Sequence, residues 1–125
     1  MKGERILKTF NYESRNVWYR NCYFDIGKYN NGKMKLDIYG YVENDKNISH
    51  ISNATVEVIG NLKENQVVID NENNTNLISF LLDLGIVKGI YKRISTGANR
   101  LPVVDLDLEK LYEYSYNFEE LEKVS

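Results

Sequence analysis

Alternating apolar and polar residues around one turn constrain the fold of this chain more than any other feature. Residues 30–32, Asn-Asn-Gly, have the composition of a tight turn. After them, every second residue from Met34 to Val42 is apolar or glycine, a period of two that a half-buried strand satisfies. Before the turn, one alternating set holds Trp18, Cys22, Phe24 and Ile26, and the other holds Tyr19, Tyr23 and Asp25. The segment therefore predicts a β-hairpin that turns one face toward the core.

Two loop lengths are possible for this hairpin, and they place the apolar residues differently. A two-residue Asn-Gly turn would pair Phe24 with Tyr39 and put the two apolar sets on opposite faces. A three-residue loop at 30–32, with Gly32 in the left-handed conformation as a bulge, pairs Phe24 with Ile38 instead. Because a slip of one residue turns every side chain over, burial favours one register. We expect the three-residue loop.

The segments after the hairpin predict short strands and loops. Residues 43–53 are polar and predict a loop. We expect strands at residues 54–58, 66–69 and 101–106, and an edge element at residues 86–94. Because proline cannot donate a hydrogen bond to a sheet, we expect Pro102 at the start of its strand or on a sheet edge.

One segment has helical spacing with a start and a stop signal. The apolar stripe consists of Leu77, Ile78, Leu81 and Leu82. Asn74 or Thr75 is the expected cap, and Gly85 is the expected end. Farther on, the tail allows two interpretations: Tyr112, Tyr114 and Tyr116 alternate as in a strand, whereas residues 107–111 have the composition of a helix start.

The sum of these elements is an α+β domain. We expect a mainly antiparallel sheet of about five or six strands, one central helix and a short C-terminal helix at residues 117–124. A length of 125 residues predicts a single domain over residues 1–125. Residues 1–15 form an arm or an opening strand in this scheme, and residues 117–125 form an acidic tail that frays.

Composition places the chain among soluble globular proteins, with 42% hydrophobic and 27% charged residues. No apolar run approaches the ~20 residues needed to span a bilayer. The charged residues at the start are not those of a secretory signal. A single cysteine excludes an internal disulfide and agrees with a reducing compartment. We therefore expect a cytoplasmic protein with no membrane partner.

Charge is unevenly distributed, although the net charge is only −2. Residues 1–35 hold eight Lys/Arg against three Asp/Glu, and residues 105–125 hold seven Asp/Glu against two Lys. Either the two ends neutralise each other in the fold, or the basic end meets an acidic partner or a phosphate backbone. A pI near 5.5 counts against the second interpretation.

Residue types suited to catalysis or metal binding are sparse. His50 is the only histidine, and Cys22, its one conceivable thiol partner, falls on the predicted core face, where a cysteine is usually inert. One cysteine and one histidine leave a zinc shell half empty. Asp105, Asp107 and Glu109 lack the glycine-centred loop of a calcium hand, and no glycine-rich phosphate loop leads into a helix. We expect no enzyme activity and no catalytic, cofactor-binding or metal-binding residues.

The side of the hairpin opposite the core is unusually rich in tyrosine. In the expected register it carries a set of candidate partner-binding residues, Tyr19, Tyr23, Tyr29, Lys33, Lys35, Tyr39 and Tyr41. Exposed tyrosines contribute large contact area at small entropic cost, as protein-binding faces require. The same residues could stack bases while lysines hold phosphates. Alternatively, the acidic tail or a second layer covers the rings.

Three stretches carry a resemblance to a known family: residues 29–34 with the strand that follows, residues 54–71, and residues 81–103. In order and spacing, residues 26–111 resemble a family of small uncharacterised proteins, a domain of unknown function from phages and mobile elements of Gram-positive and gut bacteria. The matching stretches consist of turn and core residues. The resemblance therefore implies a genomic setting, in which small proteins often block host defences, and no mechanism.

These observations lead us to expect a non-catalytic interaction protein of a phage or mobile element, an inhibitor of a host defence system that occludes the surface of a partner protein. The first alternative is a small nucleic-acid-binding accessory protein that uses its basic N-terminal half. The second alternative is a small-ligand-binding protein or hydrolase. The sequence is also compatible with a homodimer formed through the tyrosine-rich face.

Overall fold

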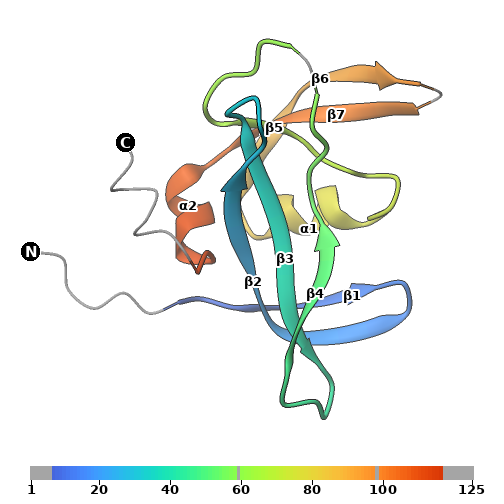
Figure 1. Cartoon of the computed structure of the whole chain (residues 1–125), viewed down its shortest axis with the longest axis vertical. Helices are drawn as coiled ribbons and strands as arrows, with labels where there is room; N and C mark the ends of the chain where they lie inside the picture. The colour runs from blue at the N-terminus through green and yellow to red at the C-terminus, as the bar shows by residue number, and fades with distance from the viewer. Residues whose placement is uncertain (1–6, 59, 98, 117–125) are drawn as a thin grey trace, which may run out of the picture.

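A computed structural model describes residues 7–58, 60–97 and 99–116 of the chain, which form two antiparallel sheets and two short helices (Figure 1). The first sheet has the order β1 (Phe10–Ser14), β2 (Val17–Lys28), β3 (Met34–Val42) and β4 (Ile48–Asn53). The second has the order β5 (Gln66–Val68), β7 (Asn99–Leu106) and β6 (Val87–Thr96). The helices are α1 (Leu77–Asp83) and α2 (Leu108–Glu113). The α+β class is confirmed, but the seven strands lie in two sheets.

The predicted register of the β2–β3 hairpin is confirmed. Phe24 pairs with Ile38, as the three-residue loop requires. The amide of Tyr29 donates to the carbonyl of Lys33 at 2.8 Å, and the amide of Gly32 donates to Tyr29 at 2.9 Å. Gly32 has φ of +84°, the left-handed conformation that closes this loop.

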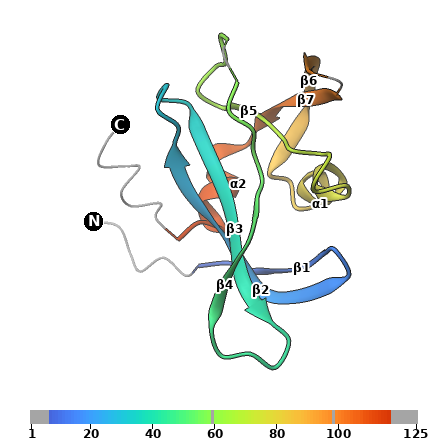
Figure 2. The same ribbon diagram turned by 45° about the vertical axis from the view of Figure 1, so that its right-hand side comes forward.

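The main core lies between the inner face of the first sheet and a layer made by α1, α2 and the second sheet (Figure 2). It contains seventeen buried residues, among them Phe24 and Ile38 from the first sheet, Leu77 and Leu81 from α1, and Leu111 from α2. A smaller cluster, Val68, Leu101 and Val103, fills the other side of the second sheet against residues of the preceding loop. Among the described residues, neither the helices nor the second sheet covers the opposite face of the first sheet, here called the outer face.

A bulge in β2 changes which side chains reach that outer face. Tyr19 pairs with Val42 and Tyr23 pairs with Tyr39, so β2 has one more residue in this interval than β3. Asn21 lies inside the bulge with φ of +52°. The extra residue reverses the alternation, as β-bulges do.

Two predictions fail because of this bulge. Tyr19 packs against the main core, whereas we expected it on the outer face. Trp18 was expected in the core and instead has 49% of its surface exposed. Strict period-two counting is valid only as far as Cys22, which is buried as predicted.

The expectation of a loop at residues 43–53 and a strand at residues 54–58 is wrong. β4 (Ile48–Asn53) occupies most of the first range as an edge strand. Only Ile51 of its apolar residues packs against the core, so it lacks a clear apolar stripe. The second range makes one isolated bridge, between Thr55 and Ile69, and passes from one sheet to the other.

The central helix is confirmed, and Gly85 ends it with φ of +79°. The predicted side-chain cap is wrong: Asn76 is the N-cap residue and makes no capping hydrogen bond. The side chain of Asn74 is used elsewhere, because its amide donates to the carbonyls of Asn53 and Asp70. Tertiary hydrogen bonds therefore replace the local cap.

The C-terminal elements are partly as expected. β6 is an edge strand, as predicted, but Pro102 lies in β7, the central strand of its sheet. The carbonyl of Pro102 accepts from Ile69, one residue beyond β5, so its missing N–H faces the side where that strand has ended. Asp107 caps α2 by accepting from the amide of Lys110.

The acidic helix and tail at residues 117–125 lie outside the described residues, and a single domain over residues 1–125 stays a prediction. Part of the expected arm at residues 1–15 is β1. Within the described ranges, no helix is long and apolar enough to cross a membrane.

Candidate functional site

Four aromatic side chains form a row across the outer face, one from each of four adjacent chain segments. Tyr23 on β2 and Tyr39 on β3 are stacked, with ring centroids 6.1 Å apart and an interplanar angle of 15°. His50 on β4 meets the edge of Tyr39 at 5.1 Å. On the other side, Tyr116 lies 5.8 Å from Tyr23. We call these four residues the aromatic row.

The C-terminal segment joins this face as a short addition to β2. The amide of Phe24 donates to Tyr114 at 2.8 Å, and the amide of Tyr116 donates to Phe24 at 3.0 Å. Within the described residues, this arrangement extends the sheet surface and does not seal it, since Tyr116 has 71% of its surface exposed. Of the other two tail tyrosines, Tyr114 packs against Phe10 in the core at 5.9 Å, and Tyr112 packs against the core from α2.

A second group of side chains lies beside the row, at the Arg20–Tyr41 pair, farther along the strands from the hairpin tip. The bulge brings Arg20 opposite Tyr41, and the guanidinium carbon of Arg20 lies 5.1 Å from the centre of the Tyr41 ring. Arg20 also donates to the carbonyl of Asp45 at 2.9 Å. Ile48 pairs with Tyr41 from the other side and has 48% of its surface exposed. Arg20 thus takes the place on this face that we predicted for Tyr19.

Charged residues lie on the other side of the row from Arg20 and Tyr41, farther along the strands toward the hairpin tip. Asp37 accepts from His50 Nε2 at 3.1 Å and has Lys35 Nζ at 3.9 Å. Asp25 pairs directly with Asp37 across the β2–β3 ladder, and both carboxylates are half-buried. Like charges placed directly opposite each other destabilise a sheet. This end of the face is therefore acidic and only partly compensated by Lys35 and His50.

The remaining predicted residues lie near the tip of the hairpin. The hydroxyl of Tyr29 is 2.8 Å from Thr55 Oγ1, and Lys35 Nζ is 5.9 Å from the centre of the Tyr29 ring. Lys33 donates from Nζ to the carbonyl of Leu62 at 2.9 Å. The structure therefore brings Tyr23, Tyr39 and Tyr41 together on the outer face. Lys35 and Tyr29 lie nearer the hairpin tip, Lys33 bonds to the loop before β5, and Tyr19 packs against the core.

Burial affects the protonation of two of these phenols. Burial raises the pKa of Tyr23 above its usual value, and the neighbouring Tyr41 and Tyr116 raise it further. Burial also raises the pKa of Tyr29, against a smaller opposing effect of the Thr55 hydrogen bond. Both rings therefore stay neutral near pH 7 and keep a hydroxyl that can donate a hydrogen bond.

Cys22 and His50 are not brought together. Cys22 is fully buried in the main core, and burial raises the pKa of its thiol to about 12. His50 lies in the aromatic row on the other face of the same sheet. Among the acids weighed for a cation, Asp105 accepts from Gln66 and Asp107 caps α2. Within the described ranges, no three His, Cys, Asp or Glu side chains gather as a metal site would require.

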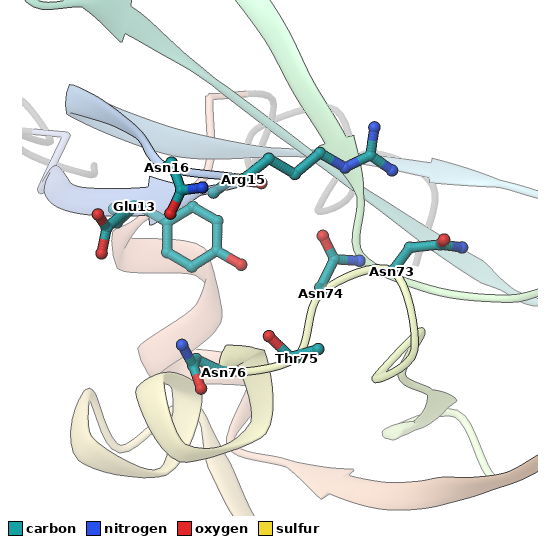
Figure 3. A pocket seen from close by; sticks show the side chains of 9 residues that line it. Glu13, Arg15, Asn16, Asn73, Asn74, Thr75 and Asn76 are labelled. Atoms are coloured by element: carbon teal, nitrogen blue, oxygen red, sulfur yellow. The ribbon is translucent and has the colours of Figure 1, made fainter.

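Two cavities lie away from the outer face. The first, about 260 Å³, lies between the β1–β2 turn and the loop before α1 (Figure 3). Its turn side includes Arg15 and Asn16, both with positive φ, and its loop side includes Asn74. Asn74 is the buried polar group of this lining, and its amide is already bonded to Ser52, Asn53 and Asp70.

The second cavity, about 430 Å³, lies between the base of the β2–β3 loop and α2. Its lining includes Lys28, Lys33, Lys63, Gln66 and Tyr112. Gln66 is buried, and both ends of its amide are used, since it donates to Asp105 and accepts from the Lys63 amide. Neither cavity therefore directs an unused polar group of Asn74 or Gln66 at a ligand.

Comparison with known proteins adds no relative: no family model, curated protein or solved structure matches the chain.

Sequence reasoning missed three members of the outer face. Arg20 was assigned to neither set because the bulge is not visible as a pattern. His50 was placed in a loop, although it stands in a run, Ile48 to Ser52, that alternates weakly. Trp18 was assigned to the core. The one local signal available was Asn21, a residue type that tolerates positive φ and so can mark a bulge.

Proposed function

We propose that this chain is a non-catalytic binding protein whose outer face docks against a partner protein. The observation that supports this is the aromatic row, which crosses four chain segments while Tyr23 and Tyr39 stay half-exposed and Tyr116 largely exposed. Both helices and the second sheet pack on the other side (Figure 2). Large aromatic surfaces left open in a monomer commonly mark interaction sites.

The composition of the face resembles the centre and rim of a protein interface. Tyr39, Tyr41 and Arg20 lie in the middle, and tyrosine and arginine are among the residue types that dominate binding energy at interfaces. The exposed Ile48 continues the apolar area, and Asp37 supplies a polar edge. An apolar centre with a polar rim is the usual anatomy of such surfaces.

The acidic end of the face specifies the chemistry of the partner. Asp25 and Asp37 are paired across the ladder, and Asp37 already has Lys35 Nζ at 3.9 Å and a hydrogen bond from His50. A partner Lys or Arg placed over Asp25 would relieve the remaining repulsion, and charge complementarity fixes register and excludes wrong partners. The surface that fits best is an apolar patch with a basic group beside it.

The resemblance to proteins of phages and mobile elements supplies the class of partner to test first, a host defence protein. Binding alone would inhibit such a protein if the outer face covers a surface that the partner needs. A second copy of this chain is the competing occupant, because the same face is available for a homodimer.

The experiment first captures a partner from the bacterial host and then measures binding between the purified partner and this purified protein. We expect Tyr39→Ala combined with Tyr41→Ala to abolish binding, while the melting temperature falls only slightly. Tyr91→Ala on β6 is the control. It removes an exposed tyrosine that lies outside the outer face, and this variant should bind the partner as the wild type does.

Two results would contradict the proposal. Binding that survives the double substitution would remove the outer face from the interface. Equal loss of binding and of thermal stability would mean that these rings are core residues. Sedimentation of the free protein tests the homodimer. If the protein is a dimer and the same double substitution makes it monomeric, the occupant of the outer face is a second copy of the chain.

A further inference from the structure

The β6–β7 hairpin carries a local excess of positive charge. Residues 84–104 contain Lys88, Lys92, Arg93 and Arg100 and no Asp or Glu, although the whole chain has a net charge of −2. All four side chains are exposed. Within the described ranges, none of them forms an ion pair. These cations are therefore available to an external anion.

The shape of the hairpin makes the charge accessible. β5 (Gln66–Val68) pairs with β7 only from Val103 to Asp105, whereas β6 and β7 pair as far as Thr96 and Asn99. The outer half of the hairpin is therefore a two-stranded ribbon that extends beyond the third strand (Figure 1). Both of its strand edges are open to a ligand at this level.

Tyr91 lies at the base of this ribbon and is directed outward by a second bulge. Ile90 pairs with Val104 and Lys92 pairs with Val103, so Tyr91 is an extra residue in β6. It has 57% of its surface exposed. Bulges on edge strands commonly redirect a side chain in this way.

Two lysine ammonium groups lie over the Tyr91 ring in cation–π positions. Lys92 Nζ from the same strand and Lys63 Nζ from the loop before β5 each lie 5.9 Å from the ring centroid. An exposed ring beside several cations has the chemistry of a site that stacks a base and holds the adjoining phosphates. An acidic protein surface would use the cations but gives no role to an exposed ring between them.

We propose that the β6–β7 ribbon binds single-stranded nucleic acid, with a base stacked on Tyr91 and the phosphates bound by Lys63 and Lys92. Stacking on one ring requires an unpaired base, so a single strand fits better than a duplex. The site is distinct from the outer face and from the basic N-terminal half that the sequence indicated. The chemistry is common to DNA and RNA.

The test is fluorescence anisotropy of the full chain with labelled oligothymidylate and oligouridylate of equal length, measured over a range of salt concentrations. We expect Tyr91→Ala to weaken binding by about tenfold and Tyr91→Phe to bind as the wild type does, because both rings stack. Lys63→Ala with Lys92→Ala should lower the slope of log K against log salt by about 1.4, since each phosphate contact in a single strand contributes roughly 0.7. The two oligonucleotides separate DNA from RNA as the preferred form.

A matched control separates this proposal from the protein-binding proposal. Tyr39→Ala with Tyr41→Ala leaves the ribbon intact and should bind the oligonucleotides as the wild type does. No detectable binding at low salt would overturn the proposal. The proposal would also be overturned if heparin or a duplex bound as tightly as the oligonucleotides and Tyr91→Ala did not change the affinity. That result would show attraction of any polyanion. Circular dichroism of Tyr91→Ala and Tyr91→Phe verifies that both variants are folded.

Discussion

The Sγ of Cys22 occupies the space that a side chain at Gly40 would need. A Cβ at position 40 would lie 2.6 Å from that sulfur and 3.0 Å from Cδ1 of Ile51. The β2 bulge places Cys22 against β3 at this point. The glycine in the middle of β3 is therefore required by close packing, and its conformation is ordinary for a strand.

This contact predicts that Gly40→Ala destabilises the protein by about 1–3 kcal/mol, the usual cost of overpacking a core. Cys22→Ala removes the sulfur, so the double variant should lose less stability than the two single variants together. Urea unfolding of the four proteins measures this coupling. Additive losses would show that the sulfur is not what excludes a methyl group at position 40.

Thr55 predicts a second stability effect, at the point where the chain leaves β4. Its hydroxyl oxygen accepts from the amide of Leu36 at 3.2 Å and lies 2.8 Å from the hydroxyl of Tyr29. Thr55→Val keeps the shape but leaves a buried N–H without its acceptor, which should cost about 1–3 kcal/mol. Tyr29→Phe removes only the second bond and should cost less. A larger loss for Tyr29→Phe in denaturant titrations would reverse this assignment.

The pair of Lys8 and Glu113 predicts a pH dependence. Lys8 Nζ lies 2.7 Å from a Glu113 oxygen, and this hydrogen bond lowers the pKa of Glu113 and raises the pKa of Lys8. The contribution of Glu113 is present above its unfolded pKa, about 4.3, and is lost as the pH falls through its lowered folded pKa. The contribution of Lys8 is present below its unfolded pKa, about 10.4, and is lost as the pH rises through its raised folded pKa.

Unfolding of wild type and Glu113→Gln over a pH series checks this window. The wild type should be the more stable protein at neutral pH, and the difference should close at both acid and alkaline ends. Both side chains are exposed, so added salt should also reduce it. A difference that stays constant from acid to alkali would contradict an ionic contribution.

The sequence predicted what local patterns determine. The β2–β3 register follows from the turn and from the apolar partners Phe24 and Ile38. The division into two sheets could not be predicted, because it depends on β7 pairing with β5, a strand far from it in the sequence. β4 was missed because an edge strand with one inward apolar side chain, Ile51, has too little alternation to detect.

The candidate face was predicted in its centre and not at its margin. Tyr39 and Tyr41 share a face because they alternate along β3, and Tyr23 joins them because it pairs directly with Tyr39. Tyr19 was assigned wrongly because the extra residue lies between it and Tyr23. The bulge is supported by a tertiary bond, from the Asn21 amide to the side chain of Asn11, which no period in β2 can indicate.

Side-chain footprinting of the outer face with hydroxyl radicals, with and without a purified partner, tests the central claim most directly. The docking proposal predicts that oxidation of Tyr23, Tyr39 and Tyr41 falls when the partner is bound, while oxidation of Tyr91 on β6 does not change. Undiminished oxidation of the three outer-face tyrosines in the complex would contradict the proposal.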